Sequence, residues 1–464
     1  MAMSEKNDLL GGALGKVEST VMGVAGTAPA FSVAVTTATI VGTVGVLSVG
    51  SVLYCGLIMF GIMLAFSHLA NMRPHAGATY AWVGKVFGPA WGFFAGWGLL
   101  VSSVVFMVSA TIPASTSTLV LIAPDLSENV NWVTFVSALW LTVITIIVTK
   151  GIKHASYTQL ILTAIESIIL LALIVGAFLQ YGSNPVHPPE LSWVSLFSFT
   201  PSTFASGALT AIFFYWGWDV TMNLGEETKT KAANSGAFWS MVNLIIFFVI
   251  MMVVVLIVMT DSEIAKANTN VLYAIADKLF PKPWNYIAVV STILSTVGTI
   301  ETQIIQFSRC LFAMARDNAM HPRYSKIHPE WQTPWVATVV IWFLGILLLF
   351  SSSYMPSIQA ILSSSIKAIG IQICFYMSLA GFACAWHYRY KKSAGLVASF
   401  SYVIWPLTSA IFMVFIALYS LPTFDLTTKL VGIGGLLIGF IPFIIGRYRV
   451  FGDESLKPAN THDD

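Results

Sequence analysis

The chain has 464 residues, of which 56% are hydrophobic and 9% are charged, and its formal net charge is +2. Soluble domains carry about 25% charged residues, so this composition excludes a soluble protein. The small net charge, spread over many connections, argues against a nucleic-acid partner.

Apolar runs of about 18 residues or more recur along the whole chain, and each is long enough to cross about 30 Å of hydrocarbon. We therefore expect an all-α polytopic protein of the lipid bilayer with about twelve transmembrane helices. Short tails remain at 1–16 and 447–464. The predicted spans, from first to twelfth, lie at about 17–44, 47–70, 89–122, 132–149, 154–181, 205–225, 236–260, 284–316, 334–352, 356–388, 396–420 and 428–446.

Lys and Arg are distributed unevenly between alternate connections of these spans. If the amino terminus is cytoplasmic, the cytoplasmic set is Lys6, Lys16, Arg73, Lys85, Lys150, Lys153, Lys229, Lys231, Arg316, Arg323, Lys326, Arg389, Lys391, Lys392, Arg447 and Arg449. The opposite set is Lys266, Lys278, Lys282 and Lys429. Because cytoplasmic loops carry the Lys/Arg excess, the pattern predicts a multi-pass protein of the plasma (cell inner) membrane with both termini cytoplasmic.

Two of the spans contain a weak point. In the first span, Gly23, Gly26 and Pro29 lie within seven residues, and Pro removes an amide hydrogen and clashes with the preceding turn. In the sixth span, Gly217 precedes a carboxylate, Asp219, whose charge inside lipid costs about 2.5–3.5 kcal/mol on insertion scales. Such a pair of interrupted segments, five spans apart, is typical of a secondary transporter's binding site. The alternative is an aromatic packing helix with one satisfied Asp.

Three motifs then resemble one known family. The first is Pro74-His-Ala-Gly-Ala-Thr-Tyr-Ala-Trp82 followed by Phe87-Gly-Pro89, and the second is Phe213 to Asp219 followed by Glu226-Glu-Thr-Lys229. The third is Ser308 to Asn318 followed by Thr333-Pro334. In this order and spacing they resemble the amino acid–polyamine–organocation (APC) superfamily of transporters, in particular its amino acid permeases. The resemblance covers nearly the whole chain.

This resemblance implies a LeuT-like core with a 5+5 inverted repeat. The core would span 17–388, with the two repeats at 17–181 and 205–388. The segment 389–446, which holds spans eleven and twelve, would lie outside the core. The break in the first span departs from the family's commoner Gly-x-Gly pattern, because it reads Gly26-Thr27-Ala28-Pro29.

The resemblance also places a substrate at the two breaks. Freed amides at the start of a half-helix suit an anion, and carbonyls at the end of one suit an ammonium. By resemblance, an amino acid's carboxylate would lie beside the first break and its amine beside the carbonyls of the second, with Asp219 ready for a second amine. The expected substrate-binding residues are Gly23, Ala25, Gly26, Thr27, Ala28, Phe213, Phe214, Trp216 and Asp219.

Gating is expected from Trp218, Asp219, Glu226 and Glu227, the last two in a salt-bridge network at the inner face. An alternative for Asp219 is purely structural: it would cap the amides of its own broken helix or bind Asn223 or Thr221. Arg309, Arg316 and Asp317 are expected to be structural residues at the end of the eighth span, where cations suit the helix dipole.

Glu166 and Glu301 are the candidates for proton coupling, because each interrupts an apolar span and burial makes proton uptake by a carboxylate easier. Glu166 falls where some relatives carry a buried Lys linked to proton coupling. The alternatives are a static buried pair between Lys367 and one of the two acids, or a cation site.

We therefore predict a secondary active transporter of an amino acid or related amine that works by alternating access, with the proton as coupling ion. The alternatives are an exchanger without net proton coupling and, from another class, a sensor or channel on the same scaffold. No nucleophile–base pair, phosphate loop or dinucleotide motif is found, so we expect neither an enzyme nor a cofactor. Cysteine and histidine spacing predicts no metal site, and a homodimer is left open.

Overall fold

The computed structural model describes residues 9, 11–229, 231–390 and 395–450. Most of the two predicted tails therefore lies outside the described residues, as do Lys6, Lys391 and Lys392 of the predicted cytoplasmic set and the side chains of 152–155 and 447–450. Within the described part, every named regular element is a helix, and one isolated bridge pairs Leu14 with Thr228. The predicted all-α fold class is confirmed.

Two spans are divided, as predicted. The first consists of α1 (Lys16–Thr27) and α2 (Pro29–Val44), and the sixth of α8 (Pro201–Tyr215) and the short α9 (Val220–Asn223). Both divisions fall at the glycine and proline positions that weakened the helical pattern.

The other ten spans contain one long helix or a series of short ones. The continuous ones are α3 (Ser48–Met72), α5 (Pro89–Ile122), α6 (Val130–Thr149), α7 (Ile152–Tyr181), α10 (Ala232–Val258), α13 (Ile287–Arg316), α14 (Trp335–Ser352) and α15 (Ile358–His387). The eleventh span has a π-helical stretch between α16 (Leu396–Ser399) and α17 (Trp405–Ser420). The twelfth has one between α18 (Leu426–Lys429) and α19 (Gly435–Ile438), and α20 (Phe440–Val450) follows. Three further helices lie in connections: α4 (Thr79–Phe87), α11 (Asp261–Ala267) and α12 (Val271–Leu279).

Length and composition make ten helical stretches of the described chain suitable for crossing a membrane. One of them, Lys16–Met72, holds both the first and the second predicted span, and the divided sixth span falls outside this set. All twelve predicted spans are thus present as helices. Their outer faces are apolar: Ile168 and Leu179 on α7 are 70% and 79% exposed, as expected for side chains that contact lipid.

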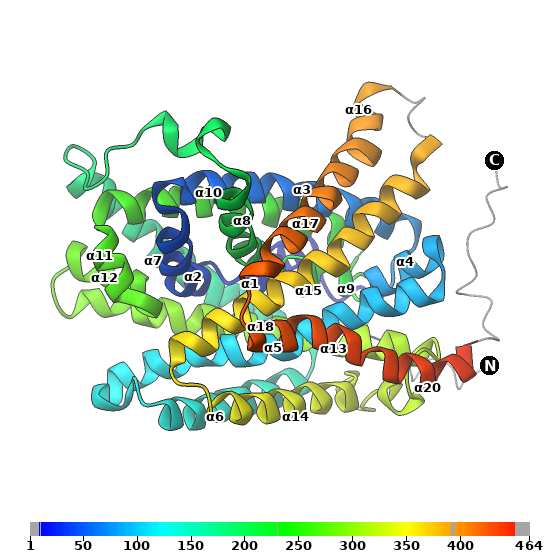
Figure 1. Ribbon diagram of the computed structural model, residues 1–464. Helices are drawn as coiled ribbons and strands as arrows, with labels where there is room; N and C mark the ends of the chain where they lie inside the picture. Colours follow the sequence, from blue (N-terminus) through cyan, green and yellow to red (C-terminus); the bar gives the residue numbers. More distant parts are fainter. Residues whose placement is uncertain (1–8, 10, 230, 391–394, 451–464) are drawn as a thin grey trace.

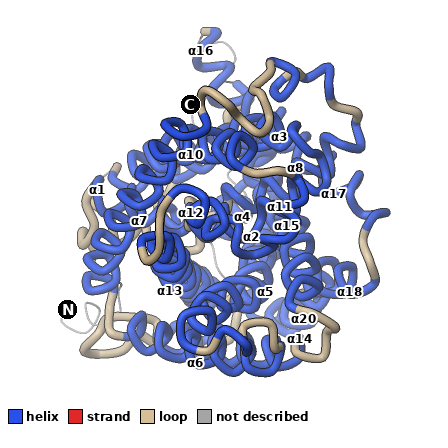
Figure 2. Tube along the Cα trace, turned by 90° about the vertical axis from the view of Figure 1, so that its left-hand side faces the viewer, coloured by secondary structure: helices blue, strands red, loops and turns tan. Residues whose placement is uncertain are grey.

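The helices form a bundle in which α1, α2, α8 and α9 lie inside. In Figure 1 the connection helices α11 and α12 lie at one end of the bundle, and α4 and α20 at the other. Both views show α6 and α14 together on one flank (Figures 1 and 2). Helix α1 packs against α10, α7 and α13, and α2 packs against α8 and α13. The two breaks are therefore surrounded by α5, α7, α10, α13 and α15.

Candidate binding site at the two helix breaks

The first break is a single residue. Helix α1 ends at Thr27, Ala28 has φ 49° in the left-handed region, and Pro29 begins α2. An alanine in this region is strained. The amide of Ala28 is not free, since it donates to the carbonyl oxygens of Val24 and Ala25 at 3.1 Å. The amides that the break releases belong to the first turn of α2.

Other helices satisfy the groups released at the first break. The carbonyl oxygen of Gly26 accepts a hydrogen bond from the Thr299 hydroxyl of α13 at 2.7 Å. The amide of Ala30 donates to Glu166 Oε1 of α7 at 2.8 Å, and the hydroxyl of Ser295 donates to the same oxygen at 2.7 Å. Glu166 thus caps α2 from a neighbouring helix, where a carboxylate suits the positive end of the helix dipole.

The second break touches the first. Gly217 has φ 116°, a value that strains any residue with a side chain. A Cβ built on Gly26 would overlap the carbonyl oxygen of Gly217, and a Cβ on Gly217 would overlap the carbonyl of Gly26. The two interrupted backbones, 191 residues apart, are therefore in van der Waals contact, and both positions require glycine.

Asp219 lies directly behind the second break and is 1% exposed. Its Oδ2 accepts a hydrogen bond from the Tyr376 hydroxyl of α15 at 2.8 Å, and that hydroxyl accepts one from Trp216 Nε1 at 2.6 Å. Asp219 Oδ1 and Trp218 Nε1 have no hydrogen-bond partner among the described residues.

Asp219 stands at the N-cap position of α9, but its side chain makes no cap hydrogen bond to that helix. The Thr221 hydroxyl donates to the carbonyl of Trp218, and Asn223 donates to the carbonyl of Ala76. Neither side chain is hydrogen-bonded to Asp219. Asp219 Oδ2 instead accepts a hydrogen bond from the Tyr376 hydroxyl on another helix. Through this hydrogen bond, Asp219 connects α15 to the second break.

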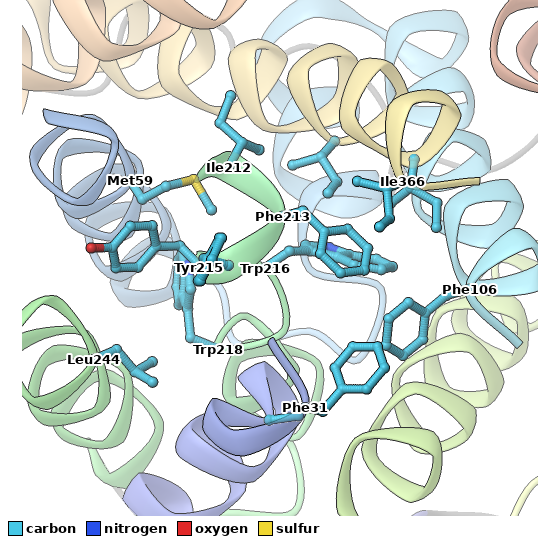
Figure 3. Close-up of a cluster of buried hydrophobic side chains, with 14 of the residues drawn as sticks. Phe31, Met59, Phe106, Ile212, Phe213, Tyr215, Trp216, Trp218, Leu244 and Ile366 are labelled. Atoms are coloured by element: carbon cyan, nitrogen blue, oxygen red, sulfur yellow. The ribbon is translucent and has the colours of Figure 1, made fainter. Parts of the chain in front are cut away.

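Four aromatic side chains meet beside the breaks (Figure 3). Phe106 of α5 contacts Phe31 of α2, Phe213 of α8 and Trp216, with ring centroids 6.0, 5.9 and 5.2 Å apart. Together these four residues are called the aromatic cluster, and each is at most 3% exposed. Offset and edge-to-face contacts of this kind can also accept an apolar body or an ammonium group.

Two of the residues predicted near the site turn away from the aromatic cluster. The ring of Phe214 packs edge to face against Phe248 of α10 at 5.2 Å. Trp218, predicted to gate, is 0% exposed and packs against Phe66 of α3 at 5.2 Å. The substrate contact predicted for Phe214 can therefore involve its backbone but not its ring.

Beyond the second break, the chain is fastened by ion pairs. Arg309 of α13 binds Glu227 through two hydrogen bonds, Nε to Oε2 at 2.9 Å and Nη2 to Oε1 at 3.1 Å, with both side chains 1% exposed. Arg316 binds Glu226 in the same bidentate way at 2.8 and 2.7 Å. Bidentate charge-assisted pairs are the strong ones. The predicted salt-bridge partners of Glu226 and Glu227 are thus both on α13.

The loop before α4 joins this network. The amide of Ala76 donates to Glu226 Oε1 at 2.8 Å, and His75 Nε2 lies 3.2 Å from Asp317 Oδ2. Burial alone would raise the pKa of Glu226, but the hydrogen bonds and charge of Arg316 outweigh it, so that pKa lies below its usual value. The network joins three segments that are distant in sequence.

Glu301 lies apart from the breaks. It is 1% exposed and accepts a hydrogen bond at 2.5 Å from Gln159 Nε2 of α7. No ion pair of the described residues involves Lys367, so the predicted static pair with Glu166 or Glu301 is not found there.

Sequence reasoning missed Tyr376, His75 and Gln159. Each reaches its partner across a helix–helix or helix–loop contact, and a single sequence does not show which face of a buried helix meets which neighbour. The sequence did contain a signal for Gln159: it lies in an apolar span, where a side-chain amide needs a buried hydrogen-bond partner.

Comparison with known proteins agrees with this architecture. A family model described as amino acid permease matches residues 16–442. The serine/threonine exchanger SteT of Bacillus subtilis is 25% identical over 61% of this chain and 63% of its own length. The branched-chain amino acid permease BcaP of the same bacterium is 22% identical over 63% and 64%, and the low-affinity putrescine importer PlaP of Escherichia coli is 20% identical over 75% of each chain. The match thus spans less than two thirds of SteT and of BcaP.

Proposed function

Because the chain belongs to the amino acid permease family, a family of membrane permeases rather than enzymes, we propose that it moves an amino acid or a related amine across the membrane by alternating access. The observation that carries the proposal is the contact between the backbones of Gly26 and Gly217. Two interrupted helices that meet inside a bundle place peptide dipoles next to one another where no water competes.

The chemistry beside the breaks fits a small zwitterion or amine. The aromatic cluster offers apolar faces. Asp219 offers a carboxylate whose Oδ2 accepts a hydrogen bond from the Tyr376 hydroxyl. The substrates named for SteT, BcaP and PlaP are a hydroxy amino acid, branched-chain amino acids and a diamine. The predicted set Gly23, Ala25, Gly26, Thr27, Ala28, Phe213, Phe214, Trp216 and Asp219 is the proposed binding site.

Alternating access needs one side to be closed while the other opens. The ion pairs Arg309–Glu227 and Arg316–Glu226 lie at the bundle end at which α1 begins and would hold that end closed. We assign this end to the cytoplasm, because the Lys/Arg excess lies there, and the membrane to the plasma (cell inner) membrane. The repeats 17–181 and 205–388 would then rock against one another about the two breaks.

Proton symport is the proposed mode, with Glu166 and Glu301 as candidate carriers. Exchange without net proton movement is the second candidate, favoured by the similarity to SteT, a serine/threonine exchanger. A channel is disfavoured by the aromatic cluster, whose members are at most 3% exposed and block a continuous polar path.

The test is uptake by the purified full chain in liposomes with labelled serine, isoleucine and putrescine as probes. Counterflow, in which vesicles are preloaded with the unlabelled probe, measures transport by either mode. A pH gradient without preloading measures symport alone. We expect counterflow of at least one probe and accumulation driven by the gradient. Counterflow without accumulation would favour the exchanger. Channel-like electrical conductance through the protein would exclude both the symporter and the exchanger.

A further inference from the structure

Gln159 and Glu301 form a buried pair between α7 and α13. Gln159 Nε2 donates to Glu301 Oε2 at 2.5 Å and to the carbonyl oxygen of Gly298 at 3.1 Å. The two side chains are 0% and 1% exposed. Because Nε2 meets two acceptors, the orientation of the amide follows from its surroundings, and both of its hydrogens are used.

One oxygen of each side chain is left without a donor. Gln159 Oε1 and Glu301 Oε1 have no hydrogen-bond partner among the described residues. Buried acceptors are nearly always paired, and an unpaired one marks strain, a missing ligand or a functional role. Here two unpaired acceptors belong to side chains that are already bonded to one another.

Few charges face this pair. Helices α2, α5, α6 and α14, which pack against α13, contain no Asp, Glu, Lys, Arg or His. Among the described side chains, the nearest charged ones along the same helices are Glu166 on α7 and Arg309 on α13, both bonded elsewhere. Other ionisable groups of packed elements are Lys16 and Glu18 on α1, Asp219 beside α9, Asp277 and Lys278 on α12, and Arg323 after α13. Lys153 and His154 of α7 lie outside the described side chains.

We infer that Glu301 is the proton-binding site of this transporter and that Gln159 is its positioning residue. In the neutral acid, the Glu301 Oε1–H donates to Gln159 Oε1 while Gln159 Nε2 donates to Glu301 Oε2. An acid and a primary amide then share two hydrogen bonds, and both unpaired oxygens are satisfied. The inference rests on the proposed proton symport and names the acid that carries the proton.

Glu166 has the opposite surroundings. Its Oε1 accepts hydrogen bonds from the Ala30 amide and the Ser295 hydroxyl at the start of α2. Donors and the positive end of a helix stabilise a carboxylate. Both donors therefore bind one oxygen of Glu166, and Glu166 holds the first break in place.

The site is connected to the first break. Thr299, two residues before Glu301 on α13, donates to the carbonyl of Gly26. When Glu301 releases H⁺ to water, the second hydrogen bond of this pair is lost, and Glu301 Oε1 and Gln159 Oε1 are again without a donor. Loss of this bond weakens the contact between α7 and α13, and α1 packs against both helices. The proton thereby favours the closed arrangement, and its loss favours opening.

The first test is Glu301→Gln in liposomes, because the new amide mimics the neutral acid and can donate to Gln159 Oε1. One pH unit drives about tenfold accumulation when one proton moves with each probe. We expect Glu301→Gln to lose this accumulation of serine, isoleucine or putrescine while counterflow, which needs no net proton movement, remains measurable. Gln180→Leu, also on α7 but bonded to the carbonyl of Leu279, should keep gradient-driven accumulation. Unchanged accumulation by Glu301→Gln, or accumulation that follows a Na⁺ gradient instead, would overturn the inference.

The second test needs no transported probe. The infrared spectrum of the purified protein should contain the carbonyl stretch of a protonated carboxylic acid that disappears in Glu301→Gln. In Gln159→Leu this band should shift in frequency and titrate at a different pH, whereas Gln180→Leu, also on α7, should leave it unchanged. A band that persists in Glu301→Gln would overturn the inference even if transport were confirmed. Failure of counterflow by the wild-type chain would instead count against the proposed function.

Discussion

The two helix breaks are held in different ways. At the first, the Gly26 carbonyl and the Ala30 amide have partners supplied by α13 and α7. At the second, Trp218 Nε1 and Asp219 Oδ1 have none among the described residues. Because natural proteins leave few buried polar groups unpaired, these hydrogen bonds give the first break a scaffold role besides its proposed contact with the substrate. At the second break, Trp218 Nε1 and Asp219 Oδ1 are available to bind a ligand or to form new hydrogen bonds when the helices move.

The largest expected effect concerns the segment behind the second break. Arg309→Met leaves Glu227 as a buried, unpaired charge, which destabilises the protein by about 3–5 kcal/mol. Thermal unfolding of the purified protein in detergent would measure this. The double variant with Glu227→Met should recover most of the loss, because no charge remains. Equal loss in the double variant would show that the pair matters through packing alone.

The contact between the breaks gives the next effect. In Gly217→Ala the φ of 116° alone costs about 1–3 kcal/mol, and overlap with Gly26 adds to it. Gly26→Ala suffers the overlap without the strain. Both variants should lose uptake of all three probes. Gly42→Ala in α2, where no atom lies within 4 Å of the new Cβ, is the matched control. Normal uptake by Gly217→Ala would refute the close contact.

Variants at the two breaks should affect stability and transport differently. Glu166→Ala strips the Ala30 amide and the Ser295 hydroxyl of their acceptor, so we expect a loss of stability of about 1–3 kcal/mol. Asp219→Asn keeps an acceptor for Tyr376 and should cost less than about 1 kcal/mol, yet it should impair transport. Unfolding and counterflow would be measured on both variants. The reverse ranking in stability would contradict the scaffold role of the first break.

The smallest effect is a pH dependence. The pKa of Glu226 is lowered in the folded protein, so its pairing with Arg316 stabilises the protein above the unfolded value of about 4.3. This stability is lost as the pH falls through the folded pKa. We expect about 1 kcal/mol, read from unfolding temperatures between neutral and acidic pH. Glu226→Gln should flatten this part of the profile, and an unchanged slope would exclude Glu226 as its source.

Much of the fold could be predicted. The twelve spans follow from apolar runs, and Pro29 and Gly217 marked the divided spans because their effect on a helix is local. Contacts across helices could not be predicted. The hydrogen bond between Tyr376 and Asp219, and the one between the Ala30 amide and Glu166, each join residues of different helices.

By itself, the sequence determined that the chain is a multi-pass membrane protein and where two of its helical spans are interrupted. These properties depend on hydropathy and on residues that act within one helical turn. Only the tertiary structure decided that Gly26 meets Gly217, that Arg309 holds Glu227 and that Glu301 pairs with Gln159. Such pairings depend on how each helix is rotated and packed against its neighbours, and no single stretch of sequence encodes that.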